Sequence, residues 1–82
     1  IKILENSARL SVNGTLSASR LIVGKANSTN TYDVDVGELK ADQLDVLGGA
    51  DIDIGGGVVQ SKVTITDGDL AVTEDFTING TH

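Results

Sequence analysis

The sequence has 82 residues, enough for one small domain, and carries a formal net charge of −6 from 12 acidic and 6 basic side chains. Because the bases are scattered, this charge argues against nucleic acid or an anionic membrane as a partner. No apolar run reaches the roughly 20 residues that span a bilayer, so we expect no membrane insertion. The absence of Cys and the single His exclude disulfides, thiolate metal sites and a His-based metal site.

Short segments of alternating apolar and polar residues predict β-strands along the whole chain. The first lie at residues 10–12 and 16–23, and a polar segment at about residues 24–33 follows, which we expect to be an exposed loop. An amphipathic helix over residues 36–47 is the one competing interpretation. The remaining alternating segments, most of them followed by Gly, Asn or Asp, are residues 34–36, 39–46, 52–54, 58–65, 70–72 and 76–78.

A ten-residue pattern, G-x-L-x-A-x-x-L-x-V, recurs along these segments. Two copies that begin at Gly14 and Gly37 share five identical positions, and looser copies begin at Gly56 and Gly68. The copies therefore start 23, 19 and 12 residues apart. We interpret each copy as two short strands joined by a bend. The residues predicted to face a shared core are Leu16, Ala18, Leu21, Val23, Leu39, Ala41, Leu44, Val46, Val58, Val63, Ile65, Leu70, Val72, Phe76 and Ile78.

Two short strands cannot bury their apolar face alone, so the copies must stack within one chain or between chains. One Phe, one Tyr and no Trp make a poor core, which favours oligomerisation. The unequal spacing favours an all-β, intertwined trimeric β-helix or β-prism. A single-chain β-solenoid, whose coils prefer a constant length, is the alternative. We expect residues 1–82 to form one repetitive β segment. Because the chain starts at Ile1 without Met, we expect a fragment of a longer protein.

The segments Gly68–Thr73, Phe76–Thr81, Asn13–Leu16 and Leu21–Gly24 resemble the shafts of bacteriophage tail fibres and tail spikes, in which short G-x-L-x-V units recur irregularly. The resemblance implies a homotrimeric structural shaft or connector in the virion tail, extracellular, which contacts other tail proteins and supports host attachment. A host glycan or receptor would be recognised by regions outside this segment. A segment of a bacterial surface adhesin, on the cell surface, is the alternative, and a stalk of a polysaccharide depolymerase is a third interpretation.

Acidic pairs are the main candidates for chemistry. Asp33–Asp35, Asp51–Asp53 and Asp67–Asp69 offer oxygens to a cation such as Ca²⁺, but none matches a known calcium loop, and alternate Asp residues in a strand simply face solvent. Paired carboxylates also serve glycosidases, yet the chain lacks the aromatic residues that wall a sugar cleft. We therefore predict no catalytic residue, no cofactor and no metal site.

Two other kinds of motif have a simpler explanation as turns. Asn13–Thr15, Asn27–Thr29 and Asn79–Thr81 match the glycosylation pattern, but such triplets are common in turns rich in Asn and Thr. Gly55–Gly57 lacks the Lys and hydroxyl residue that end a phosphate-binding loop. His82 is terminal, and we expect it to have no role.

Overall fold

The computed structural model describes residues 2–3 and 9–80, and no helix occurs among them. These residues form six strands: β1 (Lys2–Ile3), β2 (Arg9–Val23), β3 (Tyr32–Val46), β4 (Ala50–Ile65), β5 (Asp69–Val72) and β6 (Phe76–Ile78). The all-β prediction is confirmed. The competing helix over residues 36–47 is wrong, because nearly all of this segment lies in β3.

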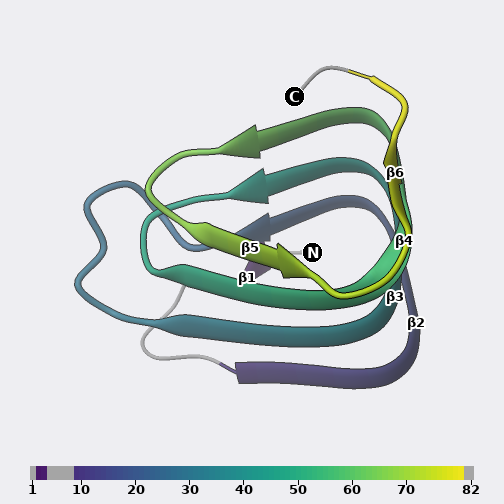
Figure 1. The fold of residues 1–82 in the computed structure, drawn as a ribbon. Coiled ribbons are helices and arrows are strands. Elements are labelled where there is room, and N and C mark those ends of the chain that lie inside the picture. Colours follow the sequence, from purple (N-terminus) through teal and green to yellow (C-terminus); the bar gives the residue numbers. More distant parts are fainter. Residues whose placement is uncertain (1, 4–8, 81–82) are drawn as a thin grey trace.

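The strands pair in parallel, in the order β1-β2-β3-β4-β5, with β6 also paired to β4. Residues of β2 pair with residues 23 or 24 places later in β3, and residues of β3 pair with residues 18 or 19 places later in β4. Each long strand bends round and stacks on the previous one (Figure 1). The chain is therefore a single-chain β-solenoid, the alternative architecture of the sequence analysis, and one polypeptide surrounds its own core.

Each turn of the solenoid has three sides, which we call A, B and C. The register shifts between Val12 and Thr15 and between Ala41 and Gln43 mark corners between them. Side A consists of residues 9–12, 33–36, 51–54 and 69–72. Side B consists of residues 15–18, 38–41, 56–59 and 76–78. Side C consists of residues 20–23, 43–46 and 62–65, with β1 paired to residues 22–23.

Alternate side chains of every side point inward and stack on their counterparts in the next turn. On side A, Val34 and Val36 pair with Ile52 and Ile54, and all four are buried. Branched aliphatic side chains suit this arrangement because they pack well on a pleated surface. Each fully buried side chain of this size contributes about 1.5–3 kcal/mol of transfer free energy. Aliphatic side chains stacked along the axis therefore supply the buried apolar surface that aromatic side chains would provide in another small domain.

The predicted core residues divide by their position along the stack. Ile65 is 53% exposed and Val72 is 37% exposed, because both lie where the described stack ends. The buried ones are Leu21, Val23, Leu39, Ala41, Leu44, Val46 and Val63. The half-buried ones are Leu16, Ala18, Val58, Leu70, Phe76 and Ile78.

Val58 was assigned to the core incorrectly. Its neighbour Val59 is the buried residue, and Val58 pairs with the exposed Lys40 on the outer surface. The offset between paired residues of β3 and β4 rises from 18 to 19, so β4 contains one extra residue. Alignment of Gly56 with Gly37 placed that residue before Gly56. In the structure it lies at the corner between sides B and C, where Gln60 and Ser61 stand opposite Asp42 alone.

The copy that begins at Gly68 was also aligned incorrectly. Leu70 and Val72 pair with Ile52 and Ile54 on side A, which the ten-residue pattern does not cover. Phe76 then pairs with Gly57 on side B. The true offsets are 18 and 19 residues, as between β3 and β4, so the spacing of 12 is wrong. These turns have nearly equal length, which removes the argument against a solenoid.

Short connections close each turn between sides C and A, at residues 24–31, 47–49 and 66–68. The longest of them carries Ser28, whose Oγ lies 3.2 Å from the Tyr32 hydroxyl in a hydrogen bond. Tyr32 was placed in the exposed loop by the sequence, but it begins β3 and is fully buried. It pairs with Ala50, and a Cβ at the neighbouring Gly49 would lie 3.1 Å from its ring.

Candidate functional site

The outer surface of side A carries a stack of carboxylates. The register places Asp33, Asp51 and Asp69 in one column and Asp35 and Asp53 in the next. Neighbouring strands of a sheet lie about 4.8 Å apart, so these carboxylates repel one another at close range. We call these five residues the acidic face. It arises because inward aliphatic residues alternate with outward aspartates on three successive turns.

The environment of the acidic face raises the pKa of one of its carboxyl groups, that of Asp53. Neighbouring side chains reduce the hydration of the Asp53 carboxylate, and the negative charges of Asp51 and Asp35 repel it. When protonated, Asp53 also hydrogen bonds to Asp35. All of these effects favour the neutral form and raise the pKa of Asp53 above its ordinary value of 3.8.

The carboxylates of the acidic face project from one sheet surface toward solvent. Within the described part of the chain, no group of three or more His, Cys, Asp or Glu residues is arranged to hold a metal ion. Asp67 lies apart from the face, in a turn with φ of 62°. The two aromatic rings lie elsewhere: Tyr32 is fully buried, and Phe76 is half-buried against the core.

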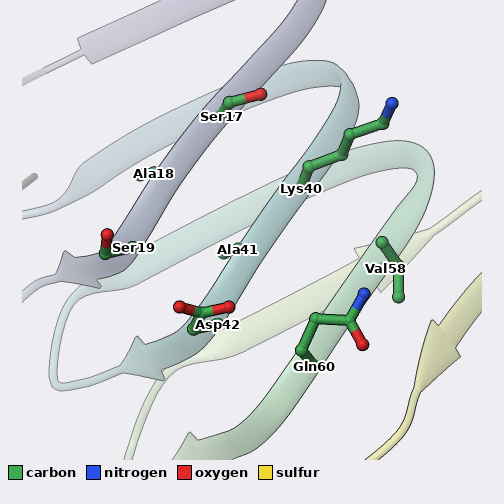
Figure 2. Close-up of a pocket in the computed structure, with 8 residues that line it drawn as sticks. All are labelled: Ser17, Ala18, Ser19, Lys40, Ala41, Asp42, Val58 and Gln60. Carbon is green, nitrogen blue, oxygen red and sulfur yellow. The ribbon is translucent and has the colours of Figure 1, made fainter.

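A shallow groove of about 440 Å³ crosses the outer surface of side B. Figure 2 shows Ser17, Lys40, Asp42 and Gln60 projecting from three adjacent turns. The groove is lined by Ser17, Ala18, Ser19, Lys40, Ala41, Asp42, Val58 and Gln60. Its hydroxyl, ammonium, carboxylate and amide groups offer hydrogen bonds, but the lining contains no aromatic ring on which a sugar could stack. A second hollow of about 290 Å³ lies near the corner between sides A and B.

Polar side chains join adjacent turns outside the core. Thr15 Oγ1 donates to Glu38 Oε1 at 3.1 Å, and Asn79 Nδ2 donates to Gln60 Oε1 at 2.8 Å. On side C, the Nε and Nη2 of Arg20 donate to Oδ2 of Asp45 at 2.8 and 2.5 Å. The Asp45 side chain is 12% exposed, so this ion pair is less screened by water than a surface pair. These contacts are structural, because each links one turn to the next.

The glycosylation-like triplets lie in three settings. Asn13 is exposed in β2, at the corner between sides A and B, and Asn27 is exposed in the 24–31 loop with φ of 59°. Asn79 is engaged with Gln60. Thr81, which completes the third triplet, and His82 lie outside the described residues.

The fold and its surface define a small β-solenoid with a stacked aliphatic core, an acidic outer face and a shallow polar groove. Comparison with protein-family models, with curated proteins and with solved structures finds no match to this chain. Among the residues that the structure describes, no helix is long and apolar enough to cross a membrane.

Sequence reasoning missed both surfaces because it treated the Asp pairs one at a time and the polar positions as a general solvated face. The offset of 18 residues that joins Asp33 to Asp51 also joins Asp51 to Asp69. This recurrence of Asp is visible in the sequence, and it was the signal that would have revealed the acidic face. The groove needed more, because Asp42 and Gln60 meet only through the register set by the corners.

Proposed function

We propose that this chain is a non-enzymatic structural segment: a β-solenoid spacer in the shaft of a phage tail fibre or spike that supports host attachment. The observation that carries the proposal is the stacked core of β2, β3 and β4, in which buried side chains hold successive turns together. A stack of this kind is stiff and can be lengthened turn by turn. The resemblance to phage shafts agrees with this role.

The proposed setting follows from the resemblance. The segment belongs to the extracellular part of a virion tail, as a homotrimer joined to other tail proteins, with receptor recognition by other regions. The outer surface supports a connecting role, because its groove is shallow and the carboxylates of its acidic face project toward solvent.

A segment of a bacterial surface adhesin is the second candidate. One observation favours it: a single chain closes its own core, with Leu39, Leu44 and Val59 contributed by successive sides and turns.

Analytical ultracentrifugation of the 82-residue chain separates the two candidates. We expect a trimer that resists dilution and heating if the chain is a fibre shaft. A folded monomer with β-type circular dichroism would contradict the trimer and favour the adhesin. Cleavage of a bacterial polysaccharide by the chain, lost in Asp51→Asn and Asp53→Asn but kept in Asp67→Asn, would overturn the non-enzymatic proposal.

A further inference from the structure

Among the residues that the structure describes, the stack of turns ends in two complementary sheet edges. At one end, β2 pairs with β3 along its length, whereas the described pairing on its other side reaches only residues 22–23. At the other end, β5 and β6 pair with β4 and with no further described strand. Unpaired edges present rows of backbone donors and acceptors that template another strand. We propose that a second copy of this chain docks here head to tail, with the β5–β6 edge of one copy against the β2 edge of the next.

The register of the solenoid predicts which residues meet. Within one chain, Leu10 stacks on Val34, Ile52 and Leu70 in turn. One further turn in the same register places Leu10 of the second copy against Leu70 of the first. By the same rule Val12 meets Val72, Leu16 meets Phe76, and Ala18 meets Ile78. All of these side chains except Val72 are half-buried, and Val72 is 37% exposed, so docking would complete the burial that the ends lack.

Charge at the two ends favours this orientation. The outer column of side A runs Arg9, Asp33, Asp51, Asp69, with the cation at one end and a carboxylate at the other. A second copy docked head to tail brings its Arg9 beside Asp69, which is otherwise next to Asp51 alone in this column. The neighbouring outward pair, Ala71 with Ser11 of the second copy, is neutral. The junction thus gains an opposite-charge pair, which sets orientation and suppresses other partners.

The helical path of the chain also matches at the junction. The last described strand, β6, lies on side B, and the first, β1, lies on side C. The backbone of β1 pairs with Ile22 and Val23, whose column continues through Val46 to Ile65. A second copy in this register therefore sets its β1 beside Ile65, which is 53% exposed.

Head-to-tail contact joins two different surfaces, so it does not close on itself and predicts linear oligomers without a fixed size. This inference does not rest on the proposed function. Stacking uses the sheet edges and leaves the outer faces free for side-by-side association, so trimers of a fibre shaft would themselves grow in steps of three. A trimer that does not grow with concentration would support the shaft and contradict stacking, whereas growing oligomers would support stacking whatever the chain's biological role.

The experiment measures the mass of the 82-residue chain by sedimentation over a wide concentration range. We expect the mass to rise continuously with concentration, and aligned concentrated samples to diffract at about 4.8 Å along the rod. Arg9→Asp sets two carboxylates against each other at the junction, and Asp69→Arg sets two guanidinium groups against each other. We expect each variant to weaken association at least about tenfold, because like charges then meet. The double variant R9D/D69R should restore it.

Asp42→Arg is the matched control, because it makes the same charge change at an exposed position of the middle turn, outside this column, and should leave association unchanged. Circular dichroism verifies that each variant is folded, and Val72→Lys gives an independent apolar test, with weaker association expected. A monomer or a fixed trimer at all concentrations would overturn the proposal. Association of Arg9→Asp and Asp69→Arg as strong as that of the wild type would also overturn the proposal.

Discussion

At the scale of the residue, Gly57 shows how closely the turns approach one another. Its φ is 137°, and a Cβ built there would overlap the carbonyl oxygen of Leu39 on the turn below. Phe76 pairs with Gly57 from the turn above and packs against the core. Gly14, at the corner between sides A and B of the first turn, has no heavy atom within 4 Å of its missing Cβ.

These two glycines make a matched prediction. Gly57→Ala should lower the free energy of unfolding by about 2 kcal/mol or more, because it combines a positive φ with a backbone clash. Gly14→Ala should leave it unchanged or raise it by up to about 1 kcal/mol, since the added methyl restricts the unfolded chain. Urea unfolding measures both. Equal losses in the two variants would contradict the close approach at Gly57.

Val63 and Lys62 test the inward and outward assignment on side C. Val63 is 5% exposed and Lys62 is exposed, although they are neighbours in β4. Val63→Asp should lower the free energy of unfolding by about 3 kcal/mol or more, because it buries a carboxylate without a partner. Lys62→Asp should change it by no more than about 0.5 kcal/mol. Thermal melts that moved equally in both variants would show that the assignment is wrong.

At the scale of the strand, β3 and β4 each carry two outward aspartates at matching positions of side A, and β5 adds Asp69. Alternation within each strand sends the aliphatic residues inward and the acids outward. Parallel pairing then stacks like charges, an arrangement that opposes folding at neutral pH. The buried ladder of Val34, Ile52, Val36 and Ile54 behind the acidic face holds the strands together against this repulsion.

The acidic face predicts a stability that depends on pH. The pKa of Asp53 is higher in the folded state than its ordinary value of 3.8, so the folded state takes up a proton first as the pH falls. Its contribution to the free energy of unfolding is therefore most favourable at acid pH and declines as the pH rises through the folded pKa. Asp53→Asn should raise the melting temperature at pH 7 and reduce the gain that the wild type shows on mild acidification. A lower melting temperature for this variant at pH 7 would contradict the repulsion.

At the scale of the whole molecule, stability is spread along an axis. The middle strand, β3, is covered on both sides by β2 and β4, and it contributes seven of the fourteen buried hydrophobic residues, the most of any strand. Strands β5 and β6 are short and have a described neighbour on one side only. In a stack where each turn contacts only its neighbours, the ends open at lower free energy than the middle.

Hydrogen exchange should follow this order. We expect backbone amides of β3 to exchange slowest, those of β5 and β6 fastest among the strands, and β2 and β4 between them. Exchange read out by mass spectrometry on proteolytic peptides provides the measurement at low protein concentration, where self-association is least. Protection of β5 equal to that of β3 would contradict independent opening of the ends.

The sequence by itself determined which residues could face a core. Period-two alternation identified Leu21, Leu44 and Val63 as inward positions, because the direction of a side chain in a strand depends only on its local place in the pleat. The same local logic predicted an all-β chain. The number and lengths of its corners could not be read this way, since one extra residue at a bend shifts every pairing after it.

Only the tertiary structure decided which segments stack. The structure places Val59, and not the predicted Val58, in the core, and it places Leu70 on side A. Neither position could be predicted, because strand pairing is set by contacts between residues 18 to 24 places apart in the chain. The acidic face and the groove on side B depend on the same register. The alternation within one strand does not determine which strand lies beside it. The acidic face and the groove therefore depend on how the turns pair around the common core.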